Sequence, residues 1–311
     1  MTAPAPQRIL VIKLGALGDF VQALGPFAAI RAHHPDADIT LLTTRPFADL
    51  GRACGFFDEV WTDPRAAWWR IGAMLALRER LRAPRFSRVY DLQTSDRSSA
   101  YLRLFWPGPC PEWSGIAKGC SHPHANPNRD SMHTVERQAE QLAMAGIAAV
   151  PPPDIAWMET DVGRFGLPDG YALLVPGGAP HRPAKRWPVA RYADLARHLA
   201  GLGAVPVVLG GKEEAGLASA IREKMPEVVD LTGKTTLADI AALARRAKLA
   251  VGNDTGPMHL IAAAGCPTLV LFSHDSDPAL CGQRGPKVDI LRVPDLATLE
   301  FEAVIERLAL P

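Results

Sequence analysis

The segment RILVIKLGALGDF, residues 8–20, indicates the fold of the first half of the chain. Its apolar run at residues 9–12 is short and rich in β-branched side chains, as expected for a buried strand, and a helical pattern follows over residues 20–33. Gly15 and Gly18 lie between the two, where the chain must turn sharply. We therefore predict a strand, a glycine-rich turn and a helix, the first unit of a parallel α/β sheet.

The same alternation recurs to the end of the chain and predicts an α/β fold with two doubly wound domains. The proline run at residues 151–153 provides a stiff spacer between them. We expect one domain over residues 1–160, a second over 161–295, and a last helix over 296–311 that returns to the N-terminal domain. Further strands are expected at residues 38–43, 59–61, 88–92, 171–175, 204–209, 228–231, 249–251 and 268–272.

The charge balance argues against a nucleic-acid-binding protein. The 311 residues include 34 Lys+Arg and 33 Asp+Glu, which leaves a formal charge of +1, whereas proteins that coat a duplex carry a large positive excess. Residues 61–106 are the exception, because they hold nine arginines and four acids. This local charge is interpreted as a surface for an anionic acceptor or an anionic membrane, or as a solvated helix face.

The cysteines and the hydropathy indicate a cytoplasmic protein with peripheral membrane contact. Five cysteines without a C-x-x-C pair favour a reducing compartment. Neither a secretory signal nor an apolar run long enough to span a bilayer is visible. Residues 106–131 read as a long loop, and its Cys110, Cys120, His122 and His124 match no zinc spacing, so we expect no metal site.

Ligands of open α/β sheets bind beyond the carboxyl ends of the strands, so the residues that follow each strand are the candidate site. After the first strand come Lys13, Gly15, Gly18 and Asp19, a turn that could hold an anion at a helix start. The glycine spacing is neither G-x-G-x-x-G nor a P-loop. Asp19 is either a charge that stabilises the helix dipole or a carboxylate exposed to the cleft.

A second turn, with Gly177 and Gly178 in the sequence PGGA, is followed by Lys185 in KRWP. Backbone donors and fixed positive charge are what a diphosphate requires. A solvent-exposed basic loop is the alternative interpretation.

The third and most specific segment is VGNDTGPMH, residues 251–259. Thr255 is a plausible helix cap and the following proline suits a first helical turn, so the backbone N–H groups there can hold phosphate. Asp254, Gly256 and His259 lie beside that helix start and are candidate ligand contacts.

Together, and in this order from residue 8 to about residue 277, these segments resemble glycosyltransferase family 9, the heptosyltransferases. The resemblance implies the GT-B architecture, with two facing Rossmann-like domains. It also implies that the N-terminal domain binds the acceptor and the C-terminal domain binds the nucleotide sugar. The implied reaction inverts the anomeric carbon and needs no metal or other cofactor.

The resemblance also assigns roles to individual residues. Asp19 is the implied general base, Lys185 pairs with the diphosphate, and Glu213 holds the adenosine ribose. Diphosphate and sugar are contacted by Asp254, Thr255, Gly256 and His259.

The implied reaction transfers heptose from ADP-heptose to an inner-core lipopolysaccharide precursor, an anionic glycolipid at the cytoplasmic face of the inner membrane. Two features depart from the family: residues 273–277 read SHDSD where many members have GPTDP, and the loops over 94–131 match nothing aligned with confidence. A family 9 or other GT-B transferase with another nucleotide sugar or glycan acceptor, and a non-catalytic nucleotide-sugar-binding protein, remain alternatives.

Overall fold

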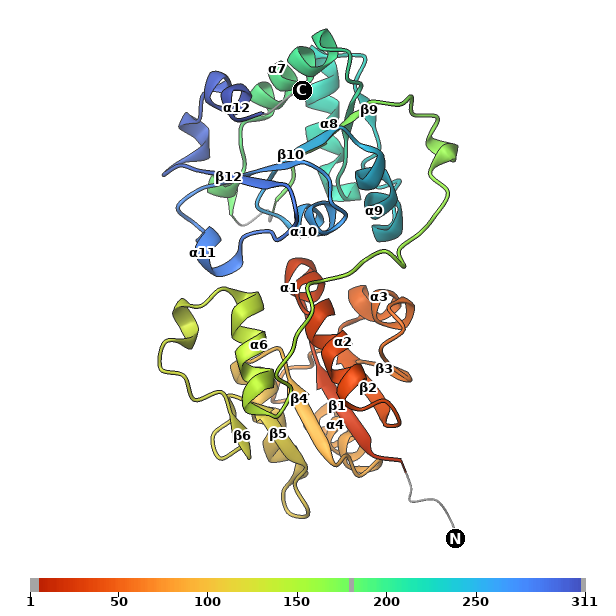
Figure 1. The fold of residues 1–311 in the computed structure, drawn as a ribbon, viewed down its shortest axis with the longest axis vertical. Helices are drawn as coiled ribbons and strands as arrows, with labels where there is room; N and C mark the ends of the chain where they lie inside the picture. Colours follow the sequence, from red (N-terminus) through yellow and green to blue (C-terminus); the bar gives the residue numbers. More distant parts are fainter. Residues whose placement is uncertain (1–5, 179–181, 309–311) are drawn as a thin grey trace. The chain divides into compact units, whose positions relative to one another are not determined.

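The computed structural model describes residues 6–178 and 182–308. Ala179 of the second glycine turn and residues 309–311 of the expected last helix lie outside this described part. The chain divides into two compact units, Met1–Asp154 and Ile155–Pro311. Each unit contains a six-stranded sheet with helices around it (Figure 1).

The first sheet has the strand order β3-β2-β1-β4-β5-β6, and all its neighbours are parallel. This order reverses between β1 and β4, which is the switch point where Rossmann-like sheets bind ligands. The strands are β1 (Arg8–Ile12), β2 (Asp38–Thr43), β3 (Glu59–Thr62), β4 (Arg88–Asp91), β5 (Glu112–Gly115) and β6 (His122–Pro123). The helices are α1 (Leu17–Gln22), α2 (Leu24–His33), α3 (Ala48–Ala53), α4 (Ile71–Arg82), α5 (Asp96–Ala100) and α6 (Thr134–Met144).

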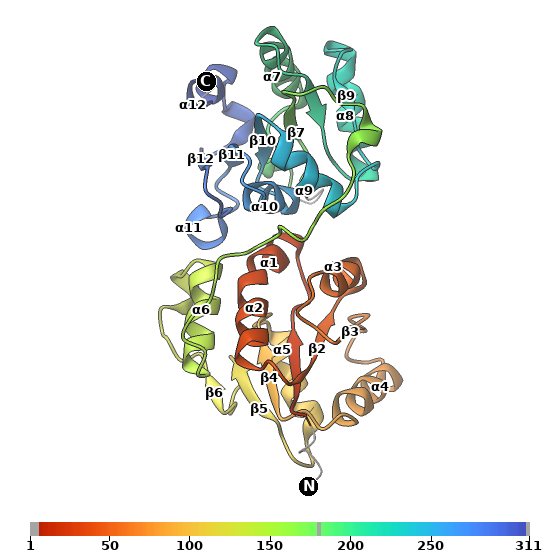
Figure 2. The same cartoon turned by 45° about the vertical axis from the view of Figure 1, so that its right-hand side comes forward.

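The second sheet repeats the same winding, in the order β12-β11-β10-β7-β8-β9, and is also parallel. Its switch point lies between β7 and β10, which are neighbours in the sheet (Figure 2). The strands are β7 (Ala172–Val175), β8 (Pro206–Val208), β9 (Val229–Asp230), β10 (Leu249–Asn253), β11 (Thr268–Phe272) and β12 (Val288–Arg292). The helices are α7 (Val189–Gly201), α8 (Ala215–Lys224), α9 (Leu237–Arg246), α10 (Gly256–Ala263), α11 (Pro278–Cys281) and α12 (Phe301–Arg307).

The central strands are apolar on both faces because helices cover both faces of a parallel sheet. The side chains of Ile9 to Ile12 in β1 and of Leu173 and Leu174 in β7 are fully buried. The prediction of two doubly wound α/β domains is confirmed.

Three local expectations differ from the structure. Residues 106–131 are more than a loop, because β5 and β6 extend the first sheet and Trp113 of β5 is fully buried. The expected helix over residues 20–33 is two helices, α1 and α2, and Pro26 lies in the first turn of α2, where its missing N–H costs nothing. The strand β12 was not expected.

The last helix of the described part, α12, packs against α7 and β12 of its own unit. Its expected return to the N-terminal domain stays a prediction. Val304 of α12 is fully buried in the core of this second unit, together with Leu296 and Leu299 just before the helix. The apolar face of this helix is therefore already covered within its own unit.

Candidate functional site

The second unit has a cavity of about 410 Å³ beside the switch point of its sheet. The loops after β7, β8 and β10 and the start of α10 all contribute to its walls. Its lining includes six of the predicted site residues: Gly178, Lys185, Glu213, Asp254, Thr255 and Gly256. Glu214, Pro257, Val175 and Arg182 also line it.

Asp254 is the most heavily engaged residue of this cavity. The Lys185 Nζ donates to its Oδ2 at 2.7 Å, as does the Ser276 hydroxyl, and the Gln283 amide donates to its Oδ1 at 3.1 Å. The two charged side chains are only 12% and 8% exposed. Burial alone would raise the pKa of Asp254, but the hydrogen bonds and the ammonium charge outweigh it and hold the pKa below its usual value.

The start of α10 offers donors to the same cavity. Thr255 is the N-cap residue, and its hydroxyl oxygen is buried with no hydrogen-bond partner among the described residues. Because the first N–H groups of a helix lack intrahelical partners, this end can receive an oxyanion. His259 lies one turn further along, is 8% exposed, and is not among the residues that line the cavity.

The glycine turn after β7 is held by Glu214, a residue that the sequence analysis missed. Its two carboxylate oxygens accept the backbone N–H groups of Gly178 at 3.0 Å and Gly211 at 2.7 Å. A Cβ atom on Gly177 would lie 1.7 Å from the Glu214 Oε1, so a side chain there would displace the Glu214 carboxylate. Both Glu213 and Glu214 line the cavity, and Glu214 in addition joins two strand-end loops.

Asn253 is the second residue that the sequence analysis missed. It is fully buried at the end of β10, and its amide nitrogen donates to the carbonyl oxygens of Pro176 at 2.8 Å and Gly177 at 3.0 Å. Its Oδ1 accepts the Trp187 N–H at 3.1 Å and the Tyr192 hydroxyl at 3.0 Å. One side chain therefore fixes both the glycine turn and the segment that follows Lys185.

We expect Asn253→Ala to lower the free energy of unfolding of the second unit by about 3 kcal/mol, because a buried polar group that loses its partner costs about 1–3 kcal/mol. Chemical denaturation of the full chain measures it. Gln283→Ala is the matched control, since the Gln283 amide donates one hydrogen bond, to Asp254. A loss no larger than in the control would show that Asn253 does not hold these loops.

In the first unit, Asp19 is the third residue of α1 and half-buried, and its Oδ2 accepts the Ala16 N–H at 3.1 Å. It lines a small cavity of about 50 Å³ with Lys13, Gln93 and Arg137. Lys13 is buried and donates to the Leu92 carbonyl oxygen at 3.1 Å. Burial lowers the pKa of Lys13, and the nearby Asp19 opposes this shift. The predicted Lys13 and Asp19 are thus brought together.

The turn after β1 requires glycine at Gly15, which has φ of 125° and would place a Cβ 2.4 Å from the Phe47 ring. Gly18 is buried at the second position of α1.

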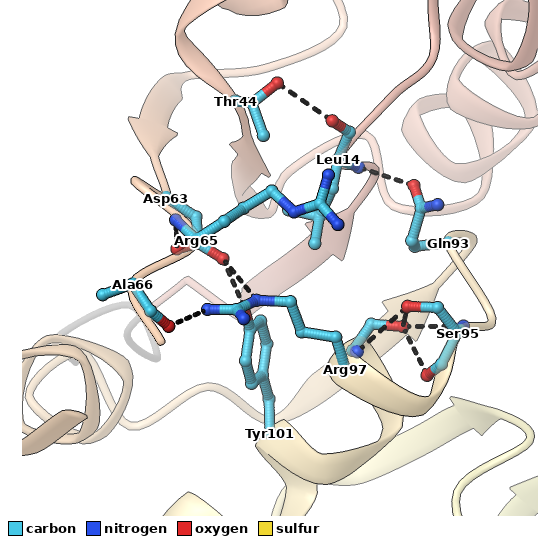
Figure 3. Close-up of polar contacts among 10 residues, drawn as sticks. Leu14, Thr44, Asp63, Arg65, Ala66, Gln93, Ser95, Arg97 and Tyr101 are labelled. Atoms are coloured by element: carbon cyan, nitrogen blue, oxygen red, sulfur yellow. Dashed lines mark hydrogen bonds and ion pairs between the residues drawn. The ribbon is translucent and has the colours of Figure 1, made fainter. Parts of the chain in front are cut away.

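Side chains at neighbouring strand ends hold this turn in place (Figure 3). The Leu14 N–H, just after β1, donates to Gln93 at 2.8 Å, and its carbonyl oxygen accepts the Thr44 hydroxyl at 2.9 Å. These bonds join the ends of β1, β2 and β4 without using any of the predicted site residues.

A second cluster lies after β3, where the buried Asp63 accepts hydrogen bonds from the Tyr101 hydroxyl and from the Arg65 N–H, the latter at 2.7 Å. The Arg97 guanidinium lies 3.9 Å from Asp63, donates to Tyr101 at 2.8 Å and to the Ala66 carbonyl oxygen at 2.7 Å (Figure 3). These three contacts fix the position of the Arg97 guanidinium at the β3 edge of the sheet.

Asp91 ends β4 and is fully buried, and its Oδ1 accepts the N–H groups of Gln93 and Thr94 at 3.2 and 3.1 Å. Burial raises the pKa of Asp91 to about 7, against the opposing effect of these hydrogen bonds and of Lys13. The Asp91 carboxyl group therefore stays protonated to a higher pH than a solvated carboxyl group does.

This shift predicts a pH dependence of stability. Because the folded pKa of Asp91 lies above that of an unfolded Asp, folding takes up a proton between pH about 4 and 7. The folded state therefore loses stability as the pH rises from about 4 through 7. Asp91→Asn removes the effect, so the variant should gain about 4 kcal/mol relative to the parent protein between pH 4 and 8. Denaturation series across this range measure the difference, and a difference independent of pH would refute the assignment.

Comparison with known proteins places this architecture in a family. A model of glycosyltransferase family 9 (heptosyltransferase) matches residues 74–304. The chain belongs to glycosyltransferase family 9. Lipopolysaccharide heptosyltransferase 1 of Escherichia coli K12 is 25% identical over 329 residues, which cover 97% of this chain and 99% of the relative. Lipopolysaccharide heptosyltransferase 2 of the same strain is 26% identical over 307 residues, covering 86% and 83%.

Solved structures share the fold of this family 9 chain. The E. coli ADP-heptose lps heptosyltransferase II matches with a TM-score of 0.77 and 23% identity, over 96% of this chain and 97% of that one. The E. coli heptosyltransferase WaaC with ADP-2-deoxy-2-fluoro heptose matches with a TM-score of 0.75 and 24% identity, over 96% and 98%. The predicted family and the GT-B fold class are confirmed, and the chain is a glycosyltransferase.

The SHDSD segment, residues 273–277, contributes to the site through Ser276, the donor to Asp254. Its two carboxylates have other partners: Asp277 caps α11 and pairs with Arg292 at 3.1 Å, and Asp275 lies 3.0 Å from His274. Within residues 6–178 and 182–308, no group of three or more His, Cys, Asp or Glu is placed to hold a metal ion.

In the segment with the cysteines and histidines, His124 is held by Glu140 of α6 at 2.7 Å, and Asn126 donates to the same carboxylate at 2.9 Å. These bonds attach the segment to α6. No helix in the described part of the chain is long and apolar enough to cross a bilayer.

Proposed function

We propose that this chain transfers heptose from ADP-heptose to an inner-core lipopolysaccharide acceptor, with inversion at the anomeric carbon and without a metal. The observation that carries the proposal is the cavity of the second unit, where Lys185, the start of α10 and the glycine turn converge. A diphosphate needs these groups, namely a cation and several backbone donors. Heptose is the sugar to test first, because the similar proteins are named lipopolysaccharide heptosyltransferases.

The proposed step is a single displacement. Asp19 takes the proton of an acceptor hydroxyl, the hydroxyl oxygen bonds to the anomeric carbon, and the bond from that carbon to the diphosphate oxygen breaks. ADP leaves with the electron pair, and attack opposite the leaving group inverts the anomeric carbon. Lys185 and the N–H groups at the start of α10 stabilise the negative charge of the departing diphosphate.

Other residues of the donor cavity hold the nucleotide sugar. Glu213, Gly178 and Gly256 line the cavity. In the proposed complex, Glu213 accepts hydrogen bonds from the ribose hydroxyls, and the two glycines let the backbone approach the diphosphate. His259 is buried in the first turns of α10. In the proposed complex it contacts the sugar or the diphosphate at the start of that helix.

An anionic acceptor is favoured by the positive charge in the first unit. Arg137 lines the small cavity with Asp19, and Arg97 is fixed near the ends of the same strands. We propose a glycolipid at the cytoplasmic face of the inner membrane as the molecule that carries these anionic groups, which places the protein in the cytoplasm and in peripheral contact with that membrane.

The nucleotide is tested by thermal unfolding with ADP and UDP. Ligand that binds only the folded state stabilises it by RT ln(1+[L]/Kd), about 2.7 kcal/mol at a hundredfold excess over Kd. We expect ADP to raise Tm and UDP to leave it unchanged at equal concentration. Protection by UDP alone would refute ADP-heptose as the donor.

The transfer itself is tested by incubating the protein with ADP-heptose and a heptose-deficient lipopolysaccharide. Release of ADP with a matching mass gain of the acceptor is the expected result. Binding of ADP-heptose without transfer to any core acceptor would instead favour a non-catalytic binding protein.

A further inference from the structure

Helix α4 of the first unit has two apolar faces, and only one of them is packed. Leu77 and Leu81 are buried in the core of the unit, and Met74 packs against the same core. The opposite face carries Ile71 and Leu75, one helical turn apart, which are 70% and 58% exposed. A surface helix normally presents polar residues on that side.

Three tryptophans extend this exposed face. Trp68 and Trp69 precede α4 and are 45% and 82% exposed, and Trp106 is 74% exposed. Trp106 lies next to the helix, because the Arg78 guanidinium donates to its carbonyl oxygen at 3.2 Å. These five residues, Trp68, Trp69, Ile71, Leu75 and Trp106, are called the α4 face below. Figure 2 shows α4 beside β3, the edge strand of the first sheet.

The charges around the α4 face are positive. Arg78 and Arg82 belong to α4, Arg70 directly precedes it, and Arg103 lies three residues before Trp106. None of the four forms an ion pair with a carboxylate of the described residues. Of the four acids in residues 61–106, Asp63 and Asp91 are 2% and 0% exposed, so they do not offset this charge at the surface. The other two acids, Glu79 and Asp96, are exposed, and so are five of the nine arginines, so the exposed charge of this segment is positive.

We propose that the α4 face is the surface by which this protein docks on an anionic lipid bilayer. Tryptophan with aliphatic side chains, bordered by arginine, is the composition of helices that lie in the membrane interface. Arginine attracts anionic headgroups, while the apolar side chains enter the boundary of the acyl chains. The inference deepens the proposed function, on which it rests for the need to reach a lipid-bound acceptor.

The test is sedimentation of the full chain with vesicles, in the absence of nucleotide sugar. We expect binding to vesicles of phosphatidylcholine with phosphatidylglycerol, weaker binding to phosphatidylcholine alone, and loss of binding as the salt concentration rises. Ile71→Ser with Leu75→Ser should weaken binding at least tenfold, because two exposed aliphatic side chains no longer enter the membrane. Arg70→Gln and Arg103→Gln should each weaken it about fivefold.

Matched controls change exposed residues elsewhere. Leu202→Ser is the apolar control and Arg222→Gln the charge control; Leu202 is 54% exposed in the second unit. Both should bind vesicles as the parent protein does. Brominated lipid should quench tryptophan emission, and Trp69→Phe with Trp106→Phe should remove most of that quenching.

Two results would overturn the inference: no binding to anionic vesicles at low salt, or equal losses in the α4 variants and the controls. Loss of self-association in the α4 variants, with vesicle binding intact, would also overturn it and assign the face to a second copy of the chain. Protection by ADP is measured on every variant. Its retention separates a failure of the docking inference from a failure of the proposed donor site.

Discussion

Asp19→Asn should reduce heptosyl transfer by about 10²- to 10⁴-fold, the usual contribution of a general base. Asparagine keeps the size of the side chain and an oxygen that can accept the Ala16 N–H, so the turn should remain in place. The lost property is the ability to take a proton. Single-turnover release of ADP from ADP-heptose with the acceptor measures the rate.

The control for Asp19 is Asp49→Asn, because Asp49 is also an acid in the first turn of a short helix of the same unit, α3. It is exposed and pairs only with Arg52 among the described residues, at 2.6 Å. Its replacement should leave the rate unchanged. ADP should still raise the Tm of both variants, since the donor cavity lies in the other unit.

The alternative for Asp19, a charge that stabilises the start of α1, leads to a different result. Removal of such a charge costs about 0.3–1 kcal/mol of stability and leaves the chemistry intact. A variant that transfers heptose at the parent rate, with this small loss of stability, would therefore remove Asp19 as the base.

Lys185→Met should have the second large effect, and it should appear in two properties. The variant leaves the carboxylate of Asp254 buried without its cation, which costs about 3–5 kcal/mol of the free energy of unfolding. It should also weaken ADP binding by about 10- to 100-fold, the effect of one lost hydrogen bond to a charged group. Chemical denaturation and titration with ADP measure the two separately.

The double variant Lys185→Met with Asp254→Asn separates these roles. The neutral amide no longer needs a cation, and Ser276 and Gln283 can still bond to it, so most of the stability should return. ADP binding should stay weak, because the cation that we propose for the diphosphate is still missing. Recovery of ADP binding in the double variant would mean that Lys185 acts only by neutralising Asp254.

The secondary structure was largely predictable because its signals are local. The expected strands at residues 38–43 and 268–272 coincide with β2 and β11, and a short apolar run ended by a polar residue or glycine suffices to indicate each. The failures have local causes as well. The strands β5 and β6 are short and lie among prolines and glycines, and β12 is only partly buried, so none of the three has the expected apolar pattern.

The candidate site was predictable in part, because ligand-binding residues follow strand ends and strand ends can be found in a sequence. Lys185, Glu213, Asp254 and Thr255 do line one cavity. Asn253 and Glu214 were missed because their neighbours Asp254 and Glu213 carry the expected chemistry. Their own role is to join loops, and that role is visible only from their hydrogen-bond partners.

The sequence by itself thus determined the two α/β halves, the family resemblance and the strand ends that carry the polar residues. Tertiary structure decided which strand ends meet. The order of each sheet places β1 beside β4 and β7 beside β10, and this brings Lys185 within 2.7 Å of Asp254, 69 positions away. The physical reason is that hydrophobic periodicity reports how a residue lies on its own strand or helix, whereas hydrogen-bond partners and exposed faces depend on how distant elements pack.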